Sequence, residues 1–234
     1  MGAISAGLQE CRERIAQACH LADRDTGSVH LLAVSKTFPA EAVREARAAG
    51  QRLFGESYLQ EALPKQAALA DLDLEWHFIG PIQSNKSRPI AEHFAWAHAV
   101  DRLKIAQRLA EARPLNLPPL NVCVQVNVSG EDSKHGVPLT EALPLAIGIA
   151  GLPGLRMRGF MCIPQATDDP AEQREPFRKL RTLFDQARAA GLPLDTLSMG
   201  MSGDLEAAIL EGATLVRVGT AIFGLRHYDK ETTP

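Results

Sequence analysis

Hydrophobic and polar positions along the chain form two alternating kinds of segment. In the first segment, apolar residues recur at three- and four-residue steps from Ile4 through Cys11 to Ile15, which predicts an amphipathic helix over about residues 3–23. A run of consecutive apolar residues follows at His30–Val34 and predicts a short strand that is buried on both faces. The chain therefore starts with a helix and continues with a strand.

The order of strand, loop, alanine-rich helix and glycine then recurs to the end of the chain. One such helix is expected from Pro39 to Ala49, where Gly50 ends it. An extra loop precedes the helix in the stretch 129–154. Eight strands are expected, centred near Leu32, Leu53, Phe78, Ala97, Val124, Arg158, Leu197 and Val216.

Eight alternating units favour a closed α/β barrel, the (β/α)8 TIM-type fold, over an open doubly wound sheet. The proline-rich stretch 114–119 is too short and too central to separate two domains. We therefore expect a single domain over residues 1–234, with the barrel at about 28–225 and the first helix as an addition.

Composition and charge exclude several classes of function. The net charge of −3 supplies no broad basic field for nucleic acid or for a membrane surface. No apolar run reaches the roughly 18 residues of a spanning helix, and the N-terminus lacks the pattern of a signal peptide. We expect a cytoplasmic protein that binds neither nucleic acid nor membrane.

The cysteines and histidines give no sign of a metal site or a disulfide. Cys11, Cys19, Cys123 and Cys162 form no CxxC pair and have mostly apolar or helical neighbours. These features indicate reduced thiols in the protein core. The seven histidines show no HxH or HxxxH spacing, so no zinc site is expected.

A lysine comes directly after the first apolar run. Because the active sites of such barrels lie at the C-terminal ends of the strands, Lys36 is expected at the mouth of the barrel. An apolar wall there lowers the pKa of a lysine, and the neutral amine attacks aldehydes. The competing interpretation is a surface lysine whose ammonium lies in water, and position alone favours that interpretation.

Glycine-rich loops follow the last two expected strands, at Leu197–Asp204 and at Arg217–Gly224. In barrels, the loops after strands seven and eight frequently bind phosphate through backbone N–H groups. Gly200, Gly203 and Gly219 allow the backbone to approach an anion closely. The two loops therefore predict a phosphate site.

Hydroxyl groups in these loops support the phosphate site, and carboxylates argue against it. Ser202 and Thr220 add hydroxyl donors. Asp204 and Glu206 already offset the dipole of the helix that starts there. The alternative is two ordinary turns in which the serine caps a helix.

An arginine is expected inside the barrel near these loops. Val216 and Val218 suit the side that packs against helices, which turns Arg217 inward. A buried guanidinium needs a partner, because an unpaired buried charge is unfavourable. A pyridine nitrogen and a barrel carboxylate such as Glu56 are both suitable, and the sequence does not choose between them.

The motifs that contain these residues closely resemble those of the pyridoxal 5′-phosphate (PLP) homeostasis protein family, whose barrel is of the alanine racemase N-terminal type. The resemblance runs nearly from end to end of the chain. Its motifs are LLAVSKT at 31–37, FGE at 54–56, WHFIGPIQSNK at 76–86, DSKHG at 132–136, LSMGMSGD at 197–204 and VRVGTAIFG at 216–224.

The resemblance implies a role for each matching residue. It implies that Lys36 holds PLP as a Schiff base and that Ser202, Gly219 and Thr220 form the phosphate cradle. It also implies that Arg217 is the partner of the pyridine nitrogen.

Five weaker candidates for contacts with the cofactor are Gly200, Met201, Ser57, His77 and Asn85. The family usually has asparagine where this chain has Ser57, which puts one polar contact in doubt. A single histidine in an apolar strand, such as His77, is more commonly a core residue with satisfied hydrogen bonds than a catalytic base.

The resemblance implies binding of PLP more strongly than catalysis with it. Arginine does not release its proton, so it favours a neutral pyridine ring and a weaker electron sink than a carboxylate would. Alanine racemases of this type add a second domain and a partner subunit that supply a tyrosine base, whereas this chain has only Tyr58 and Tyr228.

Three hypotheses follow for the function. The first is a non-enzymatic, monomeric PLP-binding protein that buffers the cofactor or delivers it to PLP-dependent apo-enzymes. The second is a PLP-dependent, racemase-like enzyme that acts on few amino acids. The third is a Schiff-base aldolase in which Lys36 reacts with the substrate itself.

Overall fold

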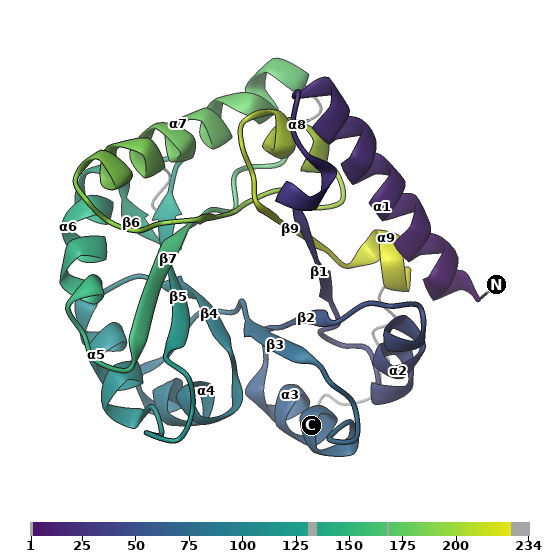
Figure 1. The fold of residues 1–234 in the computed structure, drawn as a ribbon, viewed down its shortest axis with the longest axis horizontal. Helices are drawn as coiled ribbons and strands as arrows, with labels where there is room; N and C mark the ends of the chain where they lie inside the picture. Colours follow the sequence, from purple (N-terminus) through teal and green to yellow (C-terminus); the bar gives the residue numbers. More distant parts are fainter. Residues whose placement is uncertain (1, 131–134, 168, 226–234) are drawn as a thin grey trace, which may run out of the picture.

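A computed structural model describes residues 2–130, 135–167 and 169–225 of the chain. Parallel strands form a central barrel in this part of the chain, and helices surround it (Figure 1). The strands of the barrel are β1 (His30–Val34), β2 (Leu53–Glu56), β3 (Glu75–Phe78), β4 (Trp96–Val100), β5 (Leu120–Asn127), β7 (Leu155–Met161), β8 (Thr196–Ser198) and β9 (Leu215–Val218).

Hydrogen bonds between neighbouring strands close the ring. The order is β4-β3-β2-β1-β9-β8-β7-β5, and β4 also pairs with β5. All the pairings are parallel. The (β/α)8 fold is therefore confirmed, and each of the eight expected strand centres lies within a strand of this ring.

The helices in the described part of the chain pack around the outside of the barrel (Figure 1). They are α1 (Ala3–Leu21), α2 (Ala40–Ala48), α3 (Leu59–Ala68), α4 (Ser87–His93), α5 (Leu103–Ala112), α6 (Leu139–Ala150), α7 (Pro170–Ala189), α8 (Leu205–Leu210) and α9 (Thr220–Phe223), with 3-10 turns η1 (Thr26–Ser28) and η2 (Ser84–Lys86). None of these helices is long and apolar enough to cross a membrane.

The stretch 129–154 contains a strand that the sequence did not predict. β6 (Val137–Pro138) lies outside the ring and pairs with β5 through Val126 and Val137. Its two residues are too few to show a strand period, and the expected loop is in part this short strand.

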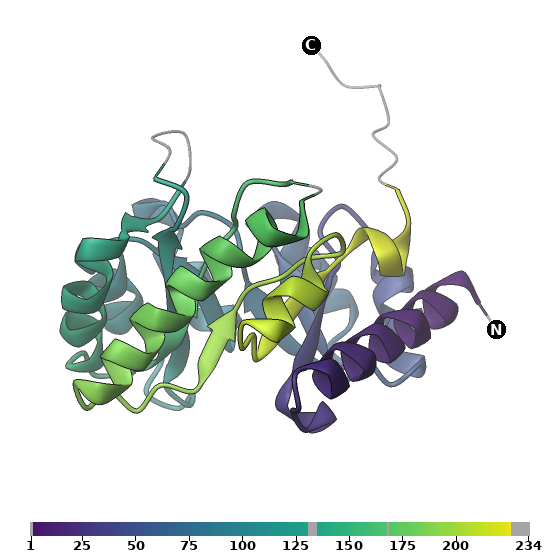
Figure 2. The same ribbon diagram turned by 90° about the horizontal axis from the view of Figure 1, so that it is seen from above.

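The additional helix α1 lies along α8 and α9, beside the last two units of the barrel (Figures 1 and 2). Arg14 of α1 donates from Nε to Glu206 Oε1 at 2.7 Å and from Nη2 to the Ser202 carbonyl at 2.9 Å. The helix therefore supports the loop that follows β8. Cys11 and Cys19 of α1 are buried free thiols, as are the other two cysteines.

Candidate functional site

A cavity of about 270 Å³ opens among the C-terminal ends of the strands. Of the residues predicted for the site, it brings together Lys36, Ser57, Met201, Ser202, Arg217, Gly219 and Thr220. These residues follow or end β1, β2, β8 and β9, which places the cavity where barrel enzymes carry out their chemistry.

Lys36 lies at the rim of this cavity, in a turn two residues after the end of β1 at Val34. Its expected position was the strand end itself. Hydrogen bonds fix the chain on both sides of this half-buried lysine. Ser35 Oγ donates to Glu56 Oε1 at 2.7 Å, and Thr37 N donates to Glu61 Oε2 at 2.8 Å.

Arg217 enters the cavity from β9 and is only 4% exposed. Its Nη1 donates to the Ser198 carbonyl at 2.6 Å and to Ser198 Oγ at 2.8 Å, and its Nη2 donates to the Cys162 carbonyl at 2.8 Å. Burial lowers the pKa of Arg217. Glu56, the carboxylate considered as its partner, instead forms an ion pair with Lys65 at 2.6 Å, so that alternative is wrong.

The loop after β8 turns sharply and is held by its own carboxylate. Gly200 has φ +94°, a backbone conformation that favours glycine, and its carbonyl accepts from Arg217 N at 2.9 Å. Asp204 Oδ1 accepts from Met201 N at 2.5 Å, and burial raises the pKa of Asp204. Glu206 is paired with Arg14 of α1.

The loop after β9 passes very close to the end of β1. A Cβ atom at Gly219 would lie 3.2 Å from the Val34 carbonyl oxygen, so a larger residue would push the two loops apart. Ser202 and Thr220 both line the cavity. Each of the two loops therefore contributes a hydroxyl-bearing residue to the wall of the cavity.

Three of the predicted residues lie elsewhere. Gly200 does not line the cavity, and a Cβ on it would lie 2.7 Å from Ala208 Cβ of α8. Asn85 is exposed in η2 and does not line the cavity either. His77 is buried in the barrel, where its ring nitrogens form hydrogen bonds with Glu75 and His98. This environment fits the interpretation of His77 as a core residue.

Apolar residues that were not among those predicted for the site complete the walls of the cavity. Val34, Phe38, Ile79 and Ile163 line it, together with Gly203. The apolar four end or closely follow β1, β3 and β7, so the rule that sites form at strand ends would have found them. Residues 132–134 of the DSKHG motif lie outside the described residues.

The fold and the cavity define a class of protein: a parallel (β/α)8 barrel whose C-terminal mouth presents an amine, a buried guanidinium and two hydroxyl-bearing loops. The sequence matches the family "Alanine racemase, N-terminal domain" over residues 8–227.

Two relatives match almost the whole chain. It is 62% identical over 228 residues to the pyridoxal phosphate homeostasis protein of Pseudomonas aeruginosa, covering 97% of this chain and 98% of that protein. It is 50% identical over 234 residues to the protein of the same name from Escherichia coli K12, covering 99% and 100%. The chain therefore belongs to the alanine racemase N-terminal domain family and, within it, to the pyridoxal phosphate homeostasis proteins, which confirms the resemblance seen in its motifs.

Solved structures agree with this assignment. PipY of Synechococcus elongatus PCC7942, in a structure with PLP bound, has a TM-score of 0.80 and 40% identity, covering 91% of this chain and 99% of that chain. A protein described as unknown from Bifidobacterium adolescentis has a TM-score of 0.87 and 35% identity, with 94% of each chain covered. Alanine racemase of Corynebacterium glutamicum shares the fold, with a TM-score of 0.71 at 19% identity over 95% of this chain and 61% of that chain.

Proposed function

We propose that this protein binds PLP at the C-terminal mouth of its barrel and serves PLP homeostasis without turning over a substrate of its own. One observation carries the proposal. Lys36, Ser202, Arg217 and Thr220 all line a single cavity. These residues come from positions as far as 184 residues apart in the sequence (220 − 36 = 184).

The groups that line the cavity fit PLP part by part. Lys36 offers an amine for covalent linkage to the aldehyde. Ser202 and Thr220 offer hydroxyl donors for the phosphate, and Arg217 offers a guanidinium for the pyridine nitrogen. The volume of about 270 Å³ lies just below the roughly 300–1,000 Å³ of most ligand sites, which suits a compact cofactor.

The same residues disfavour catalysis. Bound PLP supplies an electrophilic aldehyde and a ring that withdraws electrons. Arg217 cannot give a proton to the ring nitrogen, so the ring withdraws electrons only weakly. Racemisation also needs an acid/base group on the face opposite the lysine. Tyr58 is 51% exposed and lines a neighbouring cavity of about 260 Å³ instead of this one.

In this proposal the protein is a cytoplasmic monomer that buffers PLP and passes it to PLP-dependent apo-enzymes. The names of the P. aeruginosa and E. coli relatives and the PLP in the PipY structure support the cofactor and the homeostatic role. An open mouth at the strand ends supports exchange, because a covalent link between an aldehyde and an amine is reversible.

The experiment that tests the proposal is reconstitution with PLP, followed by borohydride reduction and peptide mass spectrometry. We expect a yellow protein and a reduced PLP adduct on Lys36. Lys36→Ala should abolish the adduct, whereas Lys104→Ala, at an exposed lysine of α5, should retain it. An adduct that persists in Lys36→Ala would place the site elsewhere, and a wild-type protein that takes up no PLP would overturn the proposal.

The same reconstituted protein tests whether it is an enzyme. In deuterated water with single L-amino acids, we expect no steady incorporation of deuterium at the α-carbon. Incorporation at enzymatic rates would favour the racemase-like function. A colourless protein that reacts covalently with a carbonyl substrate would favour the aldolase.

A further inference from the structure

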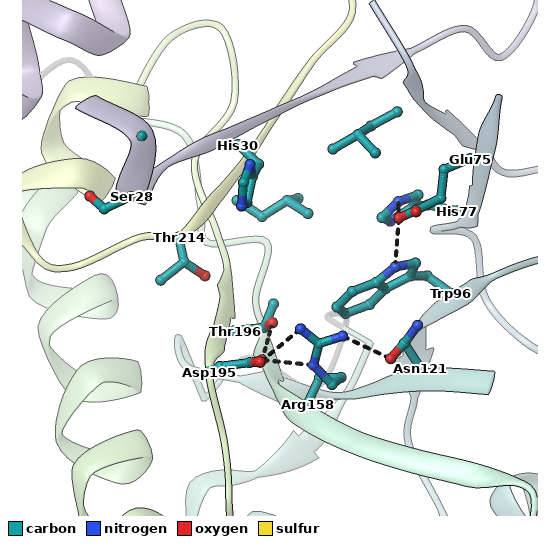
Figure 3. Close-up of a pocket in the computed structure, with 13 residues that line it drawn as sticks. Ser28, His30, Glu75, His77, Trp96, Asn121, Arg158, Asp195, Thr196 and Thr214 are labelled. Atoms are coloured by element: carbon teal, nitrogen blue, oxygen red, sulfur yellow. Dashed lines mark hydrogen bonds and ion pairs between the residues drawn. The ribbon is translucent and has the colours of Figure 1, made fainter. Parts of the chain in front are cut away.

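A second and larger cavity, of about 520 Å³, opens at the opposite end of the barrel. Figure 3 shows the polar side chains that line it, several of which lie at the N-terminal ends of strands. Glu75 and Trp96 are the first residues of β3 and β4, and His77 lies beside them. Arg158 of β7 is held between Asp195 and Asn121 by hydrogen bonds of 2.7–2.8 Å.

A chain of four hydrogen bonds crosses the barrel interior from this second cavity to the cofactor cavity. Glu75 Oε1 lies 3.0 Å from His77 Nε2, and His77 Nδ1 lies 2.9 Å from His98 Nε2. His98 Nδ1 lies 2.9 Å from Ser198 Oγ, which accepts from Arg217 Nη1 at 2.8 Å. Glu75 lines the second cavity and Arg217 lines the first.

The chemistry of the two ends sets the direction of every bond between them. A guanidinium only donates and a carboxylate only accepts. A neutral imidazole donates from one nitrogen and accepts at the other. Burial lowers the pKa of both His77 and His98, which keeps them neutral. The hydrogen bond from His77 lowers the pKa of Glu75, which keeps it ionised.

The donors therefore all point the same way. Arg217 donates to Ser198, Ser198 to His98, His98 Nε2 to His77 Nδ1, and His77 Nε2 to Glu75. Hydrogen bonds aligned in one direction polarise one another, so each strengthens the next. The chain joins a buried cation at one end to a carboxylate at the other.

This connection matters because the oxygens that accept from Arg217 are uncharged. A buried guanidinium is unfavourable without a compensating negative charge. Asp204 acts on Arg217 at longer range, but its Oδ1 accepts from Met201 N. The chain offers a second source of compensation in Glu75, whose side chain is 43% exposed at the far mouth.

The carboxylate end of the chain is itself held in place. Trp96 Nε1 donates to Glu75 Oε1 at 2.9 Å, and the Trp96 and His77 rings stack with centroids 5.2 Å apart. The Arg158 guanidinium also lies over the Trp96 ring, with its central carbon 4.5 Å from the centre of the ring. Glu75 is thus fixed in position although solvent reaches it.

From this geometry we infer that Ser198, His98, His77 and Glu75 are positioning residues for Arg217, and that they couple the second cavity to the cofactor cavity. A change in the charge of Glu75 alters the hydrogen bonding of the Arg217 guanidinium. A ligand bound to the guanidinium alters the hydrogen bonding of Glu75 in turn, because coupling between sites is reciprocal. The effect of this coupling on PLP binding rests on the proposed function, whereas the existence of the hydrogen-bond chain does not.

The first experiment uses the protein without PLP, so it does not depend on the proposed function. Nitrogen-15 NMR of labelled histidine reports which ring nitrogen carries the proton. We expect both His77 and His98 to be neutral with the proton on Nε2. Glu75→Gln should shift the ring nitrogens of His98, which Glu75 does not touch. Asp73→Asn removes an exposed carboxylate two positions earlier and should leave them unchanged.

The second experiment measures PLP binding and the visible absorption band. Ser198→Ala breaks the chain next to Arg217, and we expect a shifted band and about tenfold weaker binding, the size expected for the loss of one hydrogen bond to a charged group. Ser198→Thr keeps the hydroxyl group and should keep the wild-type band. Glu75→Gln should shift the band in the same direction as Ser198→Ala, and Asp73→Asn should not.

The outcomes separate the two proposals. If wild-type protein takes up no PLP, the proposed function fails, and the NMR experiment still decides whether the hydrogen-bond chain from Glu75 to Arg217 exists. If wild-type protein binds PLP but Glu75→Gln changes neither the His98 signals nor the band, the coupling is absent. Histidines protonated on Nδ1 in the wild type would also overturn the inference, because the donors would then point the other way.

Discussion

At the scale of single residues, a buried ion pair supports the segment that carries Lys36. Lys65 Nζ donates to Glu56 Oε1 at 2.6 Å and to the Ser35 carbonyl at 2.8 Å, and Ser35 Oγ donates to the same Glu56 oxygen. Glu56 is fully buried, and Glu56 Oε2 has no hydrogen-bond partner among the described residues. Burial raises the pKa of Glu56 even beside Lys65.

Removing one member of this pair should destabilise the fold more than removing both. Lys65→Met leaves the Glu56 carboxylate buried and unpaired, so we expect the free energy of unfolding to fall by about 3–5 kcal/mol. The double variant Lys65→Met/Glu56→Leu should recover most of that loss, because it leaves neither charge of the pair buried without its partner. Urea unfolding measures both, and a double variant less stable than the single one would contradict this account.

The two histidines of the interior chain predict how stability depends on pH. Burial lowers the pKa of His77 and His98 in the folded protein below the ordinary value of 6.5. As the pH falls below about 6.5, the two histidines therefore take up protons in the unfolded protein before they do so in the folded protein. Their contribution to the free energy of unfolding is fully present above that pH and is lost progressively below it. The slope is at most about 1.4 kcal/mol per pH unit for each histidine.

Urea unfolding from pH 5.5 to 8 measures this dependence. His98→Gln should lower the slope below pH 6.5 by up to one histidine's share, about 1.4 kcal/mol per pH unit. His93→Gln, at an exposed histidine of α4, is the matched control and should leave the slope unchanged. Equal slopes in wild type and His98→Gln would mean that His98 titrates alike in the folded and unfolded states.

The residues that follow strand ends could be predicted from the sequence, and those that pair across the barrel could not. Lys36, Ser202 and Thr220 lie where the barrel rule places a site, because every strand delivers its C-terminal end to the same mouth. His77 and His98 meet only because β3 and β4 pair in the register His77 with Trp96. A one-residue slip would separate them, and nothing local in the sequence fixes that register.

At the scale of elements, the first helix supports the side of the cavity that the loops after β8 and β9 form. Gly7 of α1 faces α9, where an added Cβ would lie 2.5 Å from the Ala221 carbonyl oxygen and 3.1 Å from Ile222 Cα. Both contacts are with backbone, which cannot move aside as a side chain can. Because α9 begins at Thr220, any displacement of α9 moves a residue of the cavity.

Gly7→Ala should therefore weaken PLP binding although Gly7 does not line the cavity. We expect a loss of stability of about 1–3 kcal/mol from overpacking, together with weaker binding of PLP. Ala6→Ser, at an exposed neighbour on the same helix, should affect neither. Fluorescence titration measures the binding. Binding that stays at the wild-type level, with stability reduced, would show that α9 does not follow the displacement.

Element boundaries show where sequence patterns locate an element and where they do not. The helix expected at Pro39–Ala49 is found as Ala40–Ala48, because proline and glycine mark its ends by their backbone preferences. The strand before Lys36 ends at Val34, and Thr37 adopts φ +69° in the turn that follows. That turn depends on the contact of Thr37 N with Glu61 of α3, which no local pattern records.

At the scale of the whole molecule, the two mouths of the barrel differ in what they offer a ligand. The C-terminal mouth presents an amine beside apolar walls and two hydroxyl-bearing loops, whereas the N-terminal mouth presents charged side chains that are mostly paired with one another. A compact ligand with an aldehyde and a phosphate suits the first mouth. Binding there should stabilise the entire fold, because the cavity is built from segments at both ends of the chain.

Thermal unfolding with and without PLP tests this global effect. At a free PLP concentration one hundred times the Kd, mass action contributes about 2.7 kcal/mol, and for a domain of this size each kcal/mol raises Tm by about 2–4 °C. We therefore expect a rise on the order of 5–10 °C in the wild type. Lys36→Ala removes the covalent link and should lose most of that rise at the same PLP concentration, while Lys104→Ala should keep it. An equal rise in Lys36→Ala would mean that phosphate and ring contacts alone hold the cofactor.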